Sequence, residues 1–212
     1  MAELGLFPLP IVLVPTERIP LHIFEPRYRE LIEECVAEET EFGLVLSTGD
    51  GAVHEIGTRA RVTQVLEVLG DGRMNVVVEG GDRFRLLELT TGRAFTTGLV
   101  EQVVDEDEPA IGADVDRALE VFNELASVAG SDVDVPERSS PTLDWELAAR
   151  VDFGVDSKQE VLASTSPRTR MARLVELLED ALEAIRLERR LRERAGRNGK
   201  VTPLELEGGG SP

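Results

Sequence analysis

The apolar residues of this chain change their spacing at one acidic stretch, Asp105 to Pro109, whose sequence is DEDEP. Before it, short apolar runs bounded by Gly, Pro and Asp predict β-strands. After it, apolar residues recur every three or four positions, which predicts amphipathic helices. We therefore expect an α+β fold with a β-rich unit over residues 1–104, a helical bundle over 105–196 and a flexible tail over 197–212.

The β-rich half is expected to form a small closed barrel with one inserted helix. It opens with apolar runs between Leu4 and Pro15 that contain three prolines and suit edge strands or barrel corners. The later strand candidates are Phe42–Ser47, Thr58–Leu69, Met74–Val78, Phe84–Leu89 and Phe95–Val104. In Thr58–Leu69 both alternating faces carry apolar residues, which indicates a strand covered on both sides. The inserted helix is predicted over Glu25–Val36, where one apolar stripe comprises Tyr28, Leu31, Ile32, Cys35 and Val36.

Four helices are predicted in the second half. The first runs from Ile111 to about Gly130, and the second opens at Ser140-Pro141. Asp156 and Gln159 have the spacing of a capping box, which predicts the start of a third helix. The fourth and longest begins at Ser166-Pro167 and is expected to end near Ala195, before Gly196. Its last turns, Arg186 to Arg194, are mostly charged and are expected to project into solvent.

Composition disfavours several classes of partner. The formal net charge is −18, from 41 acidic and 23 basic side chains, so nucleic acid and anionic membranes are unfavourable partners. Cys35 is the only cysteine, which rules out an intramolecular disulfide and fits a reducing compartment. The proline-rich start has the pattern of neither a signal peptide nor a membrane span. A cytoplasmic protein is expected.

Several ordered motifs resemble the N-terminal domain of ATP-dependent Lon proteases. They are LFPLPIVLVP from Leu6, IPLHIFEPRYRELI from Ile19, IGTRA from Ile56, DGR from Asp71 and EGGDRFR from Glu79. The wording PLHIFEPRYREL is closer to single-domain bacterial members than to the full proteases. The resemblance covers roughly residues 4 to 190.

This resemblance implies a PUA-like pseudo-β-barrel followed by a helical bundle. It also implies a role in engaging unfolded or degron-bearing polypeptides, since that is what the region does in the full proteases. The ATPase and peptidase domains that follow it in the family are not expected in this chain, which ends at Pro212.

Catalytic motifs are not supported by the sequence. Gly199-Lys200 lacks the upstream glycine and the hydroxyl residue of a phosphate-binding loop. Ser157 and Lys200 lack the setting of a serine–lysine pair, because Ser157 stands beside a helix start and Lys200 in the predicted tail. His22 and His54 show no paired ligand spacing. The chain is therefore expected to be no enzyme and to hold no cofactor or metal.

The Thr16–Phe24 segment is the predicted binding turn. Ile19, Leu21, Ile23 and Phe24 are more apolar than a solvent loop requires, so they are candidate peptide-binding residues. The competing interpretation is that they fold back as core between barrel and helix. The Arg-rich run from Arg186 to Arg197 likewise has two interpretations, a solvated helix end or a docking site for an acidic partner.

The expected function is that of a non-catalytic peptide or unfolded-protein binding module, acting as an adaptor or alongside a protease in trans. It predicts a contiguous apolar groove between the β unit and the helices. The alternative is RNA binding, because PUA-like folds include RNA binders. Aromatic residues at 4% and the strongly negative charge disfavour it. The client and the oligomeric state are left open.

Overall fold

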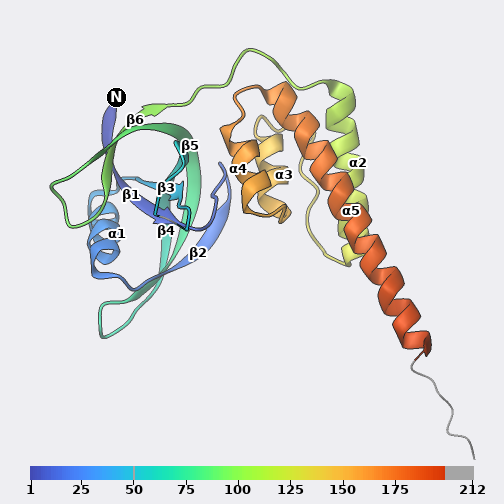
Figure 1. Cartoon of the computed structure of the whole chain (residues 1–212), viewed down its shortest axis with the longest axis horizontal. Helices are drawn as coiled ribbons and strands as arrows, with labels where there is room; N and C mark the ends of the chain where they lie inside the picture. Colours follow the sequence, from blue (N-terminus) through green and yellow to red (C-terminus); the bar gives the residue numbers. More distant parts are fainter. Residues whose placement is uncertain (50, 199–212) are drawn as a thin grey trace, which may run out of the picture.

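A computed structural model describes residues 1–49 and 51–198 of the chain. Figure 1 shows the strands gathered into one unit and four helices into a second, joined by an extended segment that passes over the top. The expected α+β organisation, with a barrel followed by helices, is confirmed. The barrel ends at Gln102 and the first helix of the second unit begins at Gly112.

Six strands in the described part of the chain form one sheet in the order β2-β5-β4-β3-β1-β6. Their bounds are Ala2–Leu9 (β1), Arg18–Ile23 (β2), Phe42–Leu46 (β3), Ile56–Val68 (β4), Met74–Thr90 (β5) and Thr97–Gln102 (β6). An additional β5–β6 pairing closes five of the strands into a ring, so the barrel has no free edge there. Strand β2 lies outside this ring and pairs only with the first half of β5. It is therefore an edge strand.

Helix α1 (Pro26–Glu38) packs its apolar stripe on the barrel core. Tyr28, Leu31, Ile32 and Cys35 are buried as predicted. Val36, the last member of the predicted stripe, is instead 43% exposed. It lies in the last turn of the helix, where it borders an open pocket with Glu39 and Thr40.

Strand β5 runs without interruption where two shorter strands, Met74–Val78 and Phe84–Leu89, were expected. The expected division into two strands was wrong, because the chain stays extended and paired through Gly80 and Gly81. Gly80 instead marks a close approach of backbone, since a Cβ there would overlap the carbonyl oxygen of Val14. The Gly80 N–H donates to the Glu17 carbonyl at 2.9 Å, and the Gly80 carbonyl accepts from the Thr16 N–H at 2.8 Å.

The β4–β5 ladder has three register shifts that the alternating pattern did not predict, and two of them place an extra residue on β4. Val62 pairs with Val78 and Gln64 with Val77, which leaves Thr63 as an extra residue. The pairings of Val65 and Glu67 leave Leu66 as a second one. Each bulge resets which side chains face which side, so the predicted two-face assignment of this strand is wrong beyond Val62.

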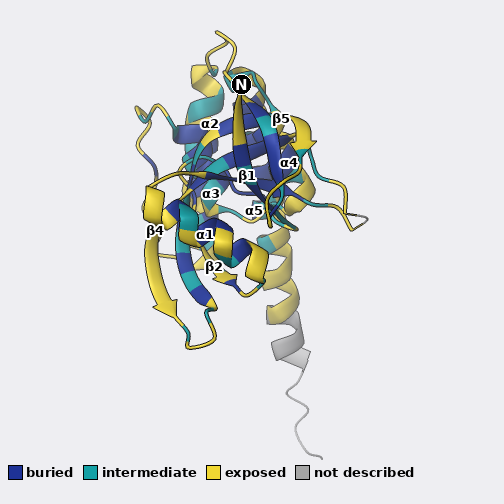
Figure 2. Ribbon diagram, turned by 90° about the vertical axis from the view of Figure 1, so that its left-hand side faces the viewer, coloured by how far each residue is buried: buried dark blue, intermediate teal, exposed yellow. Residues whose placement is uncertain are grey.

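The helical unit consists of α2 (Gly112–Ala129), α3 (Leu143–Arg150), α4 (Val155–Ala163) and α5 (Pro167–Asn198). Asp156 does not cap α4, which begins one residue earlier after Gly154 with φ 79°. Helix α5 continues past Gly196, because one glycine among strong helix formers costs only about 1 kcal/mol. Figure 2 shows its distal turns exposed. Residues 199–212 of the predicted tail lie outside the described residues. No described helix has the length and hydropathy needed to cross a membrane.

Candidate functional site

The segment predicted as a binding turn forms strand β2 instead. The segment pairs with β5 because an extended strand directs Ile19, Leu21 and Ile23 toward the barrel core. A turn would not place these three alternating side chains on one side. Ile23 is fully buried, Ile19 and Leu21 are half-buried, and Phe24 is 60% exposed just past the strand. The competing core interpretation thus describes Ile23, whereas Phe24 remains available at the surface.

The far end of the β4–β5 hairpin presents apolar side chains that the sequence reasoning did not select. Val65, Leu66 and Val68 are all exposed on β4. Val65 and Val68 are opposite Val76 and Met74 in the ladder, so they point to the α1 side of the sheet. The bulge turns Leu66 to the opposite side. The position of a bulge depends on the strand with which β4 pairs, so the orientation of Leu66 could not be predicted from the sequence.

An open groove of about 620 Å³ lies on the side of the sheet that Leu66 faces. Its lining comes from three adjacent strands: Pro20, Leu21, His22, Leu66, Glu67 and Asn75. The His22 ring stacks on Phe24, with centroids 6.0 Å apart, so Phe24 lies beside this lining residue. Of the four predicted residues, Leu21 alone is in the lining, although its side chain packs toward the barrel core. Ile19 and Ile23 do not line the groove.

A row of polar contacts crosses the floor of this groove. His22 Nδ1 is 2.7 Å from Asn75 Oδ1, and Asn75 Nδ2 donates to Glu67 Oε2 at 3.1 Å. Because the Glu67 carboxylate accepts from Asn75 Nδ2, Asn75 presents Oδ1 to the His22 ring. Glu67 Oε1 remains as an acceptor that this row does not use, and Asn75 Nδ2 keeps a second N–H.

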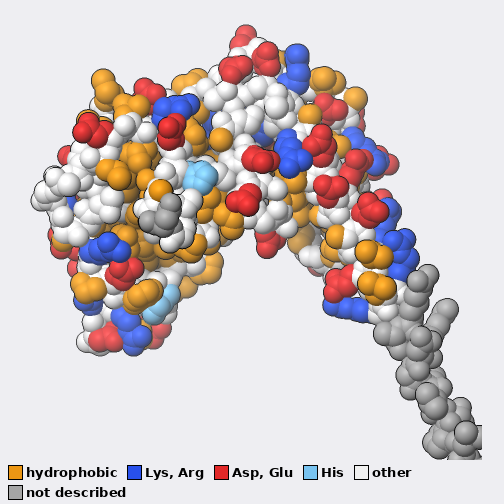
Figure 3. Space-filling view, viewed as in Figure 1, with side chains coloured by type: hydrophobic (Ala, Val, Ile, Leu, Met, Phe, Trp, Pro, Cys, Tyr) orange, Lys and Arg blue, Asp and Glu red, His pale blue; other side chains and the backbone are white. Residues whose placement is uncertain are grey.

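The seam between barrel and helices has a packed centre, and the two open pockets beside it, of about 470 and 480 Å³, are lined by several charged side chains, so they do not form the contiguous apolar groove that was expected. Barrel residues Val12, Val14, Leu46 and Ile56 share one buried cluster with helical residues Trp145, Ala148, Val161, Leu162, Leu174 and Leu177. Glu17 binds Lys158 of α4 at 2.5 Å, and the Gln159 amide donates to the Ile56 carbonyl at 3.0 Å. The hollow between the two units in Figure 3 lies beyond this seam. The seam fixes the position of the helices on the barrel.

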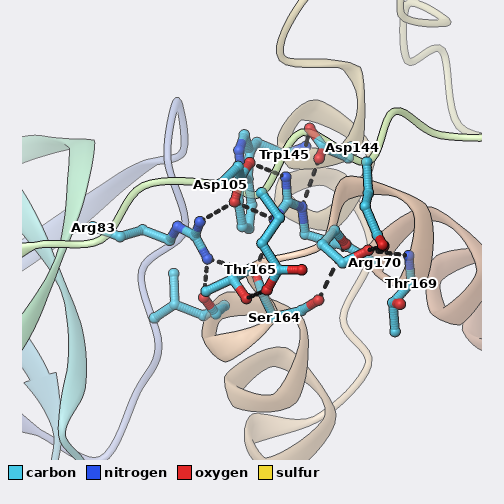
Figure 4. A network of polar contacts seen from close by, with 12 residues as sticks. Arg83, Asp105, Asp144, Trp145, Ser164, Thr165, Thr169 and Arg170 are labelled. Atoms are coloured by element: carbon cyan, nitrogen blue, oxygen red, sulfur yellow. Dashed lines mark hydrogen bonds and ion pairs between the residues drawn. The ribbon is translucent and has the colours of Figure 1, made fainter.

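Two arginines from different units meet at this seam, as Figure 4 shows. Arg170 of α5 donates to Asp105 Oδ2 at 2.5 Å and to Asp144 Oδ2 at 2.6 Å. Arg83 of β5 binds the same Asp105 carboxylate and the carbonyls of Leu162 and Ser164. Both guanidinium groups lie over the Trp145 ring, at 5.0 Å for Arg83 and 4.1 Å for Arg170.

Arg170 and the Asp105 carboxylate stabilise each other's charged forms, whereas burial and the nearby charge of Arg170 hold the pKa of Arg83 below its ordinary value. Burial raises the pKa of the Asp105 carboxyl, but hydrogen bonds and charge from Arg170 and Arg83 outweigh burial, and the net pKa is below its ordinary value. Burial lowers the pKa of Arg170, yet Asp105 and Asp144 raise it more. The sequence marked Asp105 only as part of an acidic link, so its role as a shared counter-ion was missed.

Groups considered for catalysis are dispersed. Burial raises the pKa of the Cys35 thiol inside α1, which disfavours the reactive thiolate. Ser157 lies within α4, and Lys200 is outside the described residues. Among residues 1–49 and 51–198, no three His, Cys, Asp or Glu side chains are placed to hold a metal ion.

Surfaces suited to RNA are also sparse in the described residues. Phe24 is the one exposed aromatic side chain there. Arg186 binds Glu124, and Arg192 binds Glu188 at 2.6 Å, as expected for a solvated helix end. The side chains of Arg194 and Arg197 lie outside the described residues. An acidic partner for this helix stays a prediction.

Comparison with known proteins decides the family. The sequence model of the ATP-dependent protease La (LON) substrate-binding domain matches residues 3–180. The chain belongs to this family. The Lon N-terminal domain protein from Xanthomonas campestris has a similar structure, with a TM-score of 0.65 and 25% identity over 83% of this chain and 98% of that one. The N-terminal domain of Mycobacterium avium complex Lon protease has the same fold, with a TM-score of 0.66, 17% identity and coverage of 84% and 99%.

Curated Lon relatives are much longer than the matched region. Lon protease of Anaeromyxobacter dehalogenans is 27% identical over 85% of this chain but only 23% of its own length. For Lon protease of Rhizobium meliloti, 26% identity covers 92% of this chain and 26% of the relative. The chain thus spans about a quarter of these relatives, and the family match is to the Lon substrate-binding domain alone.

Proposed function

We propose that this chain binds unfolded or degron-bearing polypeptides without catalysing a reaction, through the groove between β2 and the β4–β5 hairpin. The observation that carries the proposal is exposed apolar surface at this groove: Phe24 is 60% and Leu66 51% exposed. Such groups are unfavourable in water and gain free energy when an apolar segment covers them. The family match supports the same class of ligand.

The groove lies on strands, which hold it in a defined shape. Leu66 is fixed by the bulge in β4, and Phe24 follows directly on the buried Ile23. Because the site is preformed, the protein loses little conformational entropy on binding. Most of the entropy loss then comes from ordering the bound polypeptide. The four predicted residues then have two roles: Phe24 offers an exposed contact, whereas Ile19, Leu21 and Ile23 support the strand through the barrel core.

Binding should weaken when the two exposed side chains become polar. We expect Phe24→Ser combined with Leu66→Ser to raise the Kd for a permanently unfolded test protein about tenfold, since each change removes part of an apolar contact. Fluorescence anisotropy with the labelled test protein measures this. Leu187→Ser on the distal part of α5 is the matched control, because Leu187 is also half-exposed but lies far from the groove. If the double variant and the Leu187→Ser control lose the same affinity, or if the double variant loses none, this surface is not the binding site.

We also propose that the chain acts in the cytoplasm as an adaptor that presents clients to a protease in trans. The match to a substrate-binding domain supports this. Adding the protein to a purified Lon protease should accelerate degradation of an unfolded client. The same rate with and without the protein would contradict the adaptor role.

A further inference from the structure

The groove at β2 has a polar end built from one row of side chains. His22 Nδ1 lies 2.7 Å from Asn75 Oδ1, and Asn75 Nδ2 donates to Glu67 Oε2. Glu67 Oε1 is left as a carboxylate acceptor that the row does not use, and Asn75 Nδ2 keeps a second N–H. A ligand that binds Glu67 Oε1 must bring a hydrogen-bond donor.

Charge favours the same type of ligand. Glu67 is the one charged residue in the lining, and within the described residues no Lys or Arg nitrogen forms an ion pair with it. Nearby Glu79 differs, because Arg18 and Arg61 both bind it. Since the whole chain has a net charge of −18, the long-range field also attracts cations.

The rest of the lining is apolar and suits an aliphatic stem. Pro20 of β2 and Leu66 of β4 flank the polar row on the same side, because Pro20 precedes His22 and Leu66 precedes Glu67 in strands that both run antiparallel to β5. Leu66 and Glu67 are consecutive, and the extra residue at the bulge allows both to line the same groove. Apolar walls next to a carboxylate are the arrangement that a lysine or arginine side chain fills, with its stem on the walls and its head at the carboxylate.

We propose that this groove recognises a lysine or arginine side chain within an otherwise apolar client segment. The inference depends on the proposed function, since it assigns a substrate class to the same surface. Leu66 and Phe24 contact the apolar neighbours in the segment, and Glu67 binds the cationic head. Segments that combine apolar and basic residues are then preferred over equally apolar neutral or acidic ones.

Two labelled unstructured peptides of identical apolar pattern test this, one with a central lysine and one with norleucine, which keeps the stem and removes the charge. We expect the wild-type protein to bind the lysine peptide about threefold to fivefold more tightly, as for a partly exposed charge-assisted pair. Glu67→Gln should abolish this preference while leaving the norleucine peptide unaffected. Glu88→Gln, an equal charge change at an exposed position in the other half of β5, should preserve it.

The outcomes separate the two proposals. Equal binding of both peptides by the wild type, or a preference that persists in Glu67→Gln, overturns the cation site. If the norleucine peptide still binds and Leu66→Ser weakens it, the proposed function stands without the cation site. If neither peptide binds the wild type, both proposals fail. Higher ionic strength should reduce the lysine preference but leave norleucine binding nearly constant, because salt screens only the charged contact.

Discussion

Arg170 connects three segments that are distant in the sequence: α5, which carries it, the link at Asp105 and α3 at Asp144. Its side chain is nearly inaccessible to solvent, so removing it leaves two carboxylates without their main cation in a partly buried site. We expect Arg170→Met to lower the free energy of unfolding by about 3–5 kcal/mol, measured by urea denaturation.

The neighbouring Arg173 provides the control for this prediction. It binds Glu160 at 3.2 Å and Glu176 at 2.9 Å, but its side chain is 36% exposed. Exposed pairs of this kind contribute about 0–1 kcal/mol, so Arg173→Met should leave the urea midpoint almost unchanged. If Arg170→Met and Arg173→Met lower the free energy of unfolding equally, the buried ion pairs of Arg170 do not stabilise the fold more than exposed pairs do.

At the scale of elements, the long strand β5 depends on one glycine of an adjacent pair. A methyl group at Gly80 would overlap the Val14 carbonyl, whereas at Gly81 it would meet Glu41 Oε1 at 3.5 Å, an ordinary contact. We expect Gly80→Ala to destabilise the fold by about 1–3 kcal/mol, the usual range for overpacking, and Gly81→Ala to have little effect. Urea denaturation of the two variants checks this, and equal midpoints would contradict it.

Element types were largely predictable from the sequence, because apolar spacing differs between strands and helices. The stripe of α1 and the change of structure after Asp105 followed from that spacing alone. Continuity of β5, the bulges of β4 and the start of α4 depend on contacts with distant backbone, such as Val14 near Gly80 and Ile56 at Gln159. The groove was missed for the same reason: Leu66, Glu67 and His22 meet only through pairing of β2, β5 and β4.

For the whole molecule, the packed seam implies that barrel and helices unfold together. Trp145 is the only tryptophan and lies in the seam beside Arg83 and Arg170. Its fluorescence therefore reports the seam, whereas far-UV circular dichroism reports mainly the helices. We expect the two signals to give the same urea midpoint, as in a cooperative two-state transition. A fluorescence transition at clearly lower urea would show that the units separate before they unfold.

Strand β2 places an apolar groove beside the open edge of a sheet, a combination that elsewhere promotes aggregation. The β2–β5 register continues through Pro20 without a shift, so the missing N–H of Pro20 lies on the open side. An extended chain arriving at this edge meets a gap in the row of donors at its centre. It can contact side chains in the groove but cannot extend the sheet with a full ladder. Contact of an extended chain with this edge is therefore reversible, because contacts made only through side chains permit the chain to be released. A continuous ladder of backbone hydrogen bonds would instead favour polymerisation into a larger sheet.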